Sequence, residues 1–225
     1  MENSIIKTEK LVKRYGEGEN SFCALNGIDF EVMKGEFAAV TGESGSGKTT
    51  LLNCLGSLDR PTEGKIISCG KELTGMNDKQ LSLYRRKNIG FIFQSYRLIP
   101  VLNTEENIVL PCNLDNTPPD MDFLNELLEL TGLESKRTNY PHELSGGQQQ
   151  RVAFARALIH KPQIILADEP TGNLDSKNSR EIISILKSSI KKYNQTLILI
   201  THDGSIAAQA DRVFRMTDGV LSEQG

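Results

Sequence analysis

Four short runs of almost uninterrupted apolar residues stand out along the chain: FAAVT at 37–41, IGFIF at 89–93, IILAD at 164–168 and LILIT at 197–201. Such runs are typical of strands in a parallel sheet, because both faces of that sheet are covered. Segments with helical character separate them, at 48–58, 78–87, 176–193 and 205–210. The alternation predicts an α/β domain with a mostly parallel core sheet, whose ligands bind at the carboxyl ends of the strands.

The N-terminal part of the chain follows a different pattern. Residues 5–15 and 25–36 alternate apolar and polar positions, and the two segments meet at turns that contain glycine. This alternation is typical of antiparallel strands that bury only one face. We therefore expect an antiparallel β subdomain that precedes the parallel core.

The strand signal disappears between residues 95 and 161. Two helices are expected there, one over 120–133 and one that begins within LSGGQQQR at 144–151. Both segments repeat apolar residues at helical rather than alternating spacing. The sequence thus predicts a single domain over residues 1–225, with a helical subdomain inserted at 95–161.

Charge narrows the classes of partner. The chain has 26 Lys and Arg against 29 Asp and Glu, which gives a net charge of −3. The only dense basic stretch is YRRK at 84–87. Nucleic-acid-binding domains usually carry a basic patch or stripe, so we expect no nucleic-acid partner.

The cysteine pattern and the length of the apolar runs indicate the cellular compartment. The N-terminus lacks the apolar core and cleavage site of a secretory signal, and no apolar run approaches the ~20 residues that span a bilayer. Scattered cysteines without a CxxC pair indicate neither a disulfide framework nor a zinc site. We expect a cytoplasmic protein that reaches a membrane only through a partner. The cysteines are Cys23, Cys54, Cys69 and Cys112.

The clearest chemical motif is GESGSGKTT at 42–50, which matches G-x-x-x-x-G-K-[ST] and lies between a predicted strand and a predicted helix. Its glycines let backbone N–H groups turn toward phosphate oxygens, and the helix N-terminus adds its positive dipole end. Lys48 would neutralise phosphate charge, and the Thr49 hydroxyl would bind Mg²⁺. The predicted phosphate-binding residues are Gly42, Glu43, Ser44, Gly45, Ser46, Gly47, Lys48, Thr49 and Thr50.

Two adjacent carboxylates follow the third apolar run. Asp168, at the end of that predicted strand, is placed to bind the Mg²⁺ of a phosphate-loop site. Glu169, next to it, can polarise a water for attack on the γ-phosphate. A phosphate loop alone would fit kinases, GTPases and many ATPases, and the acidic pair narrows this field.

Three motifs together resemble the nucleotide-binding subunit of an ATP-binding cassette (ABC) protein: GESGSGKT at 42–49, LSGGQ at 144–148 and ADEPTGNLD at 167–175. The resemblance covers essentially the whole chain. It implies the ABC ATPase fold, ATP and Mg²⁺ as cofactors, and ATP hydrolysis as the reaction. In this family LSGGQ caps the γ-phosphate of ATP held by a second copy, so an ATP-induced, head-to-tail homodimer is implied. The capping contacts would come from Ser145, Gly146, Gly147 and Gln148.

The resemblance also implies individual roles. Tyr15 would stack on adenine, and Asp175 would reach across the dimer to the opposite site. Gln94 would complete the Mg²⁺ site, and His202 would contact the γ-phosphate. One position departs from the family pattern, because Glu43 stands where close relatives often have proline, and we expect its side chain to face solvent. The expected catalytic residues are Lys48, Glu169 and His202, and the expected metal ligands are Thr49, Gln94 and Asp168.

Within the family the sequence is most similar to the branch of macrolide exporters, lipoprotein-release systems and bacitracin-type peptide-resistance transporters. In that branch the membrane partner is a separate permease with a large extracytoplasmic domain. The expected function is therefore that of an ATPase which drives such a permease from the inner face of the cell membrane. Its cargo would be a peptide or antibiotic, or it would support lipoprotein release.

Other classes of ATPase remain as alternatives. The main one is a cell-division-type ABC ATPase, which transmits a mechanical signal to a cell-wall hydrolase without transport. ABC ATPases that act on nucleic acid are disfavoured, because the long coiled coils or extra domains typical of them are absent from the sequence. A small-molecule kinase would share the phosphate loop but would have no use for LSGGQ.

Overall fold

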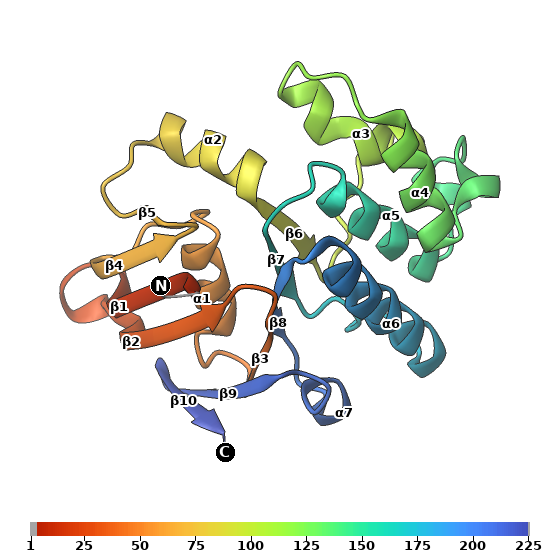
Figure 1. The fold of residues 1–225 in the computed structure, drawn as a ribbon. Coiled ribbons are helices and arrows are strands. Elements are labelled where there is room, and N and C mark those ends of the chain that lie inside the picture. Colours follow the sequence, from red (N-terminus) through yellow and green to blue (C-terminus); the bar gives the residue numbers. More distant parts are fainter. Residues whose placement is uncertain (1–3, 225) are drawn as a thin grey trace.

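The chain is built on two sheets (Figure 1). The structure, a computed structural model, describes residues 4–224, apart from the side chains at 19, 176 and 177. The N-terminal sheet is antiparallel, with the strand order β2-β1-β4-β5. The antiparallel subdomain expected from the alternating pattern is therefore confirmed. Its strands are β1 (Ser4–Tyr15), β2 (Phe22–Met33), β4 (Glu63–Ser68) and β5 (Lys71–Glu72).

The core sheet has six strands in the order β10-β9-β3-β8-β7-β6. All neighbouring pairs are parallel except β9 and β10. The four apolar runs all form strands of this sheet, as predicted. The other two strands, β9 and β10, were not expected, because polar residues interrupt them and most of their positions are partly or fully exposed. The strands are β3 (Phe37–Gly42), β6 (Ile89–Phe93), β7 (Ile164–Asp168), β8 (Thr196–Ile200), β9 (Arg212–Thr217) and β10 (Val220–Gln224).

Each face of the core sheet has its own apolar cluster. Leu197 and Leu199 of β8 pack in the cluster that includes α5 and α6, whereas Ile198 and Ile200 pack in the cluster that includes α1 and the N-terminal sheet. Successive strand residues point to opposite faces, so a strand covered on both sides must be apolar throughout. The helices beside the sheet are α1 (Lys48–Leu55), α2 (Asp78–Asn88), α6 (Ser176–Tyr193) and α7 (Gly204–Ala207).

Three helices fill the chain between β6 and β7: α3 (Thr104–Leu114), α4 (Met121–Thr131) and α5 (Gly146–Leu158). Figure 1 shows them on the far side of the core sheet from β1 and β2. The sequence predicted α4 and α5 but missed α3, because Pro111 lies inside that helix. A capping box between Asn103 and Glu106 marks its start. The bounds of the inserted subdomain, 95–161, stay a prediction.

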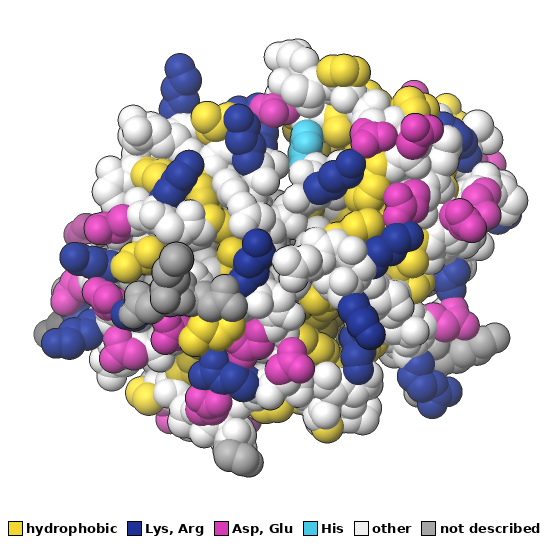
Figure 2. Space-filling view, viewed as in Figure 1, with side chains coloured by type: hydrophobic (Ala, Val, Ile, Leu, Met, Phe, Trp, Pro, Cys, Tyr) yellow, Lys and Arg dark blue, Asp and Glu magenta, His cyan; other side chains and the backbone are white. Residues whose placement is uncertain are grey.

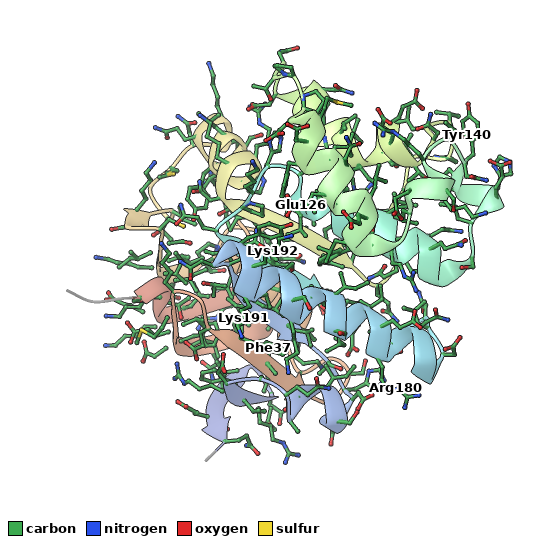
Figure 3. The ribbon with its side chains drawn as sticks, turned by 45° about the vertical axis from the view of Figure 1, so that its right-hand side comes forward. Phe37, Glu126, Tyr140, Arg180, Lys191 and Lys192 are labelled. Atoms are coloured by element: carbon green, nitrogen blue, oxygen red, sulfur yellow. The ribbon has the colours of Figure 1, made fainter. Side chains whose placement is uncertain are left out.

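Helix α4 is tied to the last turn of α6. Lys192 Nζ lies 2.6 Å from Glu126 Oε1, and the Tyr193 hydroxyl donates a hydrogen bond to the same oxygen at 2.7 Å. Figure 3 shows Lys192 and Glu126 on these neighbouring helices. The helical part is thus fastened to the core as well as inserted in it. Three short 3-10 helices complete the fold: η1 (Gly18–Asn20), η2 (Glu134–Lys136) and η3 (Pro141–Glu143).

The surface carries charges of both signs. On the face seen in Figure 2, basic and acidic side chains are interspersed with apolar ones rather than gathered by sign. Such a mixed surface produces no strong field of one sign on that face. Among residues 4–224, no helix combines the length and the apolar character that crossing a membrane requires.

Candidate functional site

The phosphate loop runs from the end of β3 into α1. Gly42, Gly45 and Gly47 have positive φ values of 145°, 79° and 107°. A Cβ atom at Gly42 would lie 2.3 Å from the Met216 carbonyl oxygen, and one at Gly47 would lie 2.3 Å from the Ala24 carbonyl oxygen. Only glycine fits these two positions, because the backbone conformation and the close approach both exclude a side chain.

The start of α1 supplies positive charge to the loop. No side chain caps the helix N-terminus, whose first N–H groups have no partner within the helix. Lys48 Nζ donates hydrogen bonds to the carbonyl oxygens of Gly42 at 2.8 Å and Glu43 at 2.6 Å, which hold the ammonium group inside the loop. Uncapped amides and a fixed cation are the features of a phosphate site.

A cavity of about 540 Å³ opens over this loop. Most of the residues predicted to bind nucleotide or metal line it, although they come from separate segments of the chain. Glu43 and Ser46 do not: the Glu43 side chain is exposed, as expected, and Ser46 is buried. A contribution of these two through backbone N–H groups stays a prediction. The lining residues are Tyr15, Phe22, Ala24, Gly42, Ser44, Gly45, Gly47, Lys48, Thr49, Thr50, Gln94, Asp168, Glu169, Ile200 and His202.

A hydroxyl and a carboxylate meet at the end of β7, because Thr49 Oγ1 lies 3.4 Å from Asp168 Oδ1. Burial raises the pKa of Asp168 above its ordinary value; the hydrogen bond from Thr49 opposes this shift, and the neighbouring carboxylate of Glu169 adds to it. Such hard oxygen donors suit Mg²⁺, which usually takes one or two protein ligands and keeps several waters. The described residues contain no cluster of three or more His, Cys, Asp or Glu that could hold a metal ion.

Gln94, the third predicted metal ligand, directly follows β6 and also lines the cavity. Asn173 Nδ2 donates a hydrogen bond to the Gln94 carbonyl oxygen at 3.0 Å, and Gln94 Nε2 lies 3.5 Å from Asn173 Oδ1. The loop after β7 therefore supports Gln94. The sequence analysis did not single out Asn173, because its partner lies 79 positions away.

Glu169, the predicted general base, has an unusual backbone conformation and a buried carboxylate oxygen. Its backbone is in the left-handed region, with φ of 46°, a conformation that costs energy for a residue with a side chain. Its Oε2 atom is buried and makes no hydrogen bond within the described part of the chain. His202 Nδ1 lies 2.9 Å from that oxygen. The imidazole is well exposed, so it can turn toward a ligand in the cavity.

Two aromatic side chains also line the cavity. Tyr15 ends β1, Phe22 begins β2, and the two residues stand opposite each other in the antiparallel register. Both are exposed, at 40% and 58%, and both line the cavity. Sequence reasoning singled out Tyr15 but missed Phe22, because only the strand register places Phe22 beside it.

The LSGGQ segment lies outside this cavity. Ser145 is the N-cap of α5, where its Oγ atom accepts a hydrogen bond from the Gln148 N–H at 3.3 Å. Gln148 Oε1 in turn accepts from the Ser145 N–H at 2.9 Å, which completes a capping box. Gly146 and Gly147 are the first two residues of the helix. None of these four residues lines the cavity of its own chain.

The second glycine has a structural reason within the chain. A Cβ atom at Gly147 would lie 2.8 Å from Asn178 Oδ1, so glycine lets the start of α5 approach the start of α6. Asn178 donates two hydrogen bonds to Asp175, from its N–H at 2.9 Å and from Nδ2 at 2.7 Å. The structure therefore brings Ser145–Gln148 and Asp175 together into a second cluster, which we call the signature cluster.

Comparison with known proteins decides the family. A family model described as ABC transporter matches residues 25–172. The chain belongs to the ABC transporter family. It is 44% identical over 219 residues to the lipoprotein-releasing system ATP-binding protein LolD of Cytophaga hutchinsonii, with 96% of this chain and 98% of LolD covered. It is 45% identical over 219 residues to the macrolide export ATP-binding/permease protein MacB of Chlorobaculum tepidum, with 96% of this chain and 33% of MacB covered.

A solved structure agrees with this ABC assignment. The ATP-binding cassette MJ0796, described as a dimer in a post-hydrolysis state bound to ADP and Pi, superposes with a TM-score of 0.90 at 38% identity, and the match covers 97% of both chains. The predicted ABC ATPase fold is confirmed, as is the resemblance to the branch that contains LolD and MacB. This ABC protein binds ATP and hydrolyses it to ADP and phosphate.

Proposed function

We propose that this ABC ATPase closes as a head-to-tail homodimer around two ATP molecules with Mg²⁺ and so drives a separate membrane permease. The observation that carries the proposal is the separation of the two clusters. The cavity holds the reacting groups, whereas the signature cluster presents the exposed Ser145 hydroxyl at the start of α5, outside that cavity. A helix N-terminus is suited to bind an anion. In a second copy it would supply what the first cavity lacks.

Within one cavity, different residues would bind the base, the phosphates and the metal ion. Tyr15 and Phe22 would bind the base, and the phosphate loop with Lys48 would bind the phosphates. Thr49, Asp168 and Gln94 would hold Mg²⁺, which when bound supplies positive charge beside the β- and γ-phosphates. These assignments rest on the lining of the cavity and on the contact between Thr49 and Asp168.

The reaction is the transfer of the γ-phosphoryl group to water. The water oxygen attacks the γ-phosphorus, the bond from this phosphorus to the oxygen of ADP breaks, and Glu169 accepts the proton of the water. The buried, unbonded Oε2 atom of Glu169 supports this choice of base. His202, 2.9 Å from that atom, would contact the γ-phosphate.

Closure follows from where the γ-phosphate would sit. It would touch the phosphate loop of one copy and Ser145 of the other, so ATP would bind the closed dimer more tightly than ADP does. Hydrolysis removes this difference, and the dimer reopens. The dimeric state described for MJ0796 supports the assembly, and the joint ATP-binding/permease name of MacB supports a permease partner at the inner face of the membrane. Lipoprotein release or the export of an antibiotic is the function that the named relatives favour.

The test measures the Mg·ATPase rate per mole of protein against protein concentration. We expect the specific activity to rise with concentration and to vanish in Ser145→Arg, because the bulky cation would block the shared site. Ser222→Arg, an exposed change on β10, is the matched control and should retain activity. A rate that is independent of concentration and indifferent to Ser145→Arg would contradict the proposal.

A further inference from the structure

The Tyr15 hydroxyl is tethered to a carboxylate from another part of the chain. Tyr15 Oη donates a hydrogen bond of 2.5 Å to Asp59 Oδ2. Lys13 Nζ donates to Asp59 Oδ1 at 2.6 Å and to the Arg60 carbonyl oxygen at 2.7 Å. The same ammonium group lies 4.7 Å from the centroid of the Tyr15 ring. Asp59 therefore joins the cation and the ring in one small network.

The electrostatics of this network keep each proton in place. Burial raises the pKa of Tyr15 to about 12, the hydrogen bond to Asp59 adds to the shift, and a hydrogen bond with Thr50 opposes it. Burial also acts to raise the pKa of Asp59, but the hydrogen bonds from Lys13 and Tyr15 outweigh it and leave that pKa below its ordinary value. At neutral pH the phenol is thus the donor and the carboxylate the acceptor. Hydrogen bonds to a charged group are among the stronger ones in proteins.

The position of Asp59 links Tyr15 to the helix that begins in the phosphate loop. The N–H groups of Leu58 and Asp59 donate to the Asn53 carbonyl oxygen at 2.8 and 3.2 Å, so this loop is attached directly to α1. Helix α1 begins at Lys48 in the phosphate loop. Asp59 therefore holds the aromatic ring on the same rigid element that holds the phosphate loop.

We infer that Asp59 is a positioning residue for nucleotide binding, because its carboxylate fixes the ring of Tyr15 for the base. The inference rests on the proposed base-binding function of Tyr15. Lys13 covers one face of the ring, so the base would stack on the other face. A tyrosine at the exposed end of β1 would otherwise sample several rotamers, and binding would have to order it first.

The experiment separates base binding from phosphate binding. KM and kcat for Mg·ATP are measured for Asp59→Ala, Asp59→Asn, Tyr15→Phe, Tyr15→Ala and the double variant with Asp59→Ala and Tyr15→Phe. Binding of inorganic tripolyphosphate, which has no base, is measured by calorimetry. The matched control is Glu63→Ala, which removes the exposed ion pair with Arg14 on the same strand and leaves Tyr15 untouched.

We expect Asp59→Ala and Tyr15→Phe each to raise KM for ATP roughly three- to tenfold, with kcat unchanged, since each removes the charge-assisted hydrogen bond between the two side chains. Asp59→Asn should give a smaller rise, because the amide oxygen still accepts from the phenol. Tripolyphosphate affinity should stay constant, and the double variant should be no weaker than either single variant, because both changes release the same ring.

Three results would contradict the inference or the proposed base site. If Tyr15→Ala raised KM for ATP but Asp59→Ala and Tyr15→Phe did not, the positioning inference would fail while the proposed base site stood. If Tyr15→Ala left KM unchanged, the proposed base site itself would fail. A loss of tripolyphosphate affinity in Asp59→Ala would also overturn the inference, because it would show general damage to the cavity. Should Asp59→Ala not fold, Tyr15→Phe and Asp59→Asn carry the same test.

Discussion

The N-termini of α1 and α5 are both suited to bind an anion, but only that of α5 is capped by a side chain. No side chain caps α1, and its first amides belong to a cavity that also contains Lys48, Asp168 and Glu169. At α5, Ser145 and Gln148 cap each other's backbone. A helix start that is exposed to water is stabilised by a cap of its own. This difference supports the proposal that the cavity binds a ligand of its own chain and that the signature cluster binds a ligand held by a second copy.

The largest expected effect comes from Glu169→Gln, which changes the cavity and leaves the signature cluster intact. We expect the rate of ATP hydrolysis to fall by at least ~10²-fold, because the amide cannot accept a proton from water. ATP binding and closure should persist, so a stable ATP-bound dimer should accumulate. Steady-state ATPase assays measure the first effect, and light scattering after size-exclusion chromatography measures the second. A monomer under saturating Mg·ATP would contradict the scheme.

The next effect is a recovery of activity when two inactive variants are mixed. Glu169→Gln damages the cavity and Ser145→Arg damages the signature cluster, so a mixed dimer contains one site in which both halves are intact. Random pairing makes half of the dimers mixed, so an equal mixture should regain up to about a quarter of the wild-type rate. Titration of one variant into the other measures the recovery. If the mixture were no more active than the sum of its components, the cavity of one copy would not be completed by the signature cluster of another.

The parts of the fold that the sequence predicted are those with a strong local signal. The four apolar runs became strands because both faces of the core sheet are covered. The phosphate loop could be predicted because steric rules confine Gly42 and Gly47 to glycine. Helix α3 was not predicted, because Pro111 is unfavourable inside a helix, although the capping box at Asn103 indicates a helix start. Strands β9 and β10 escaped because exposed edge strands do not form apolar runs.

The parts of the candidate site that the sequence could not predict depend on contacts between distant segments. Phe22 gains a place in the cavity only through its register with Tyr15. Asp59 reaches Tyr15 across 44 positions, and Gly147 meets Asn178 only because α5 and α6 pack together. Such pairs leave no periodic signal in the sequence, since the fold alone creates them.

The smallest expected effect concerns thermal stability. It compares an acidic residue of the cavity, Asp168, with one of the signature cluster, Asp175. Burial raises the folded-state pKa of Asp168 above its ordinary value of 3.8, so the charged form is penalised in the folded protein. This penalty is absent at low pH, where the carboxyl is protonated in both states, and it develops as the pH rises through the window above 3.8. Asp168→Asn should therefore raise the melting temperature by a few degrees at pH 7, while it weakens ATPase activity.

Asp175→Asn is the matched change in the signature cluster, where Asn is as good a helix cap as Asp, so the melting temperature should stay the same. Thermal unfolding of the three proteins from pH 4 to pH 8 measures both effects, and an equal rise in both variants, or one that does not shrink toward pH 4, would show that burial of Asp168 is not its cause.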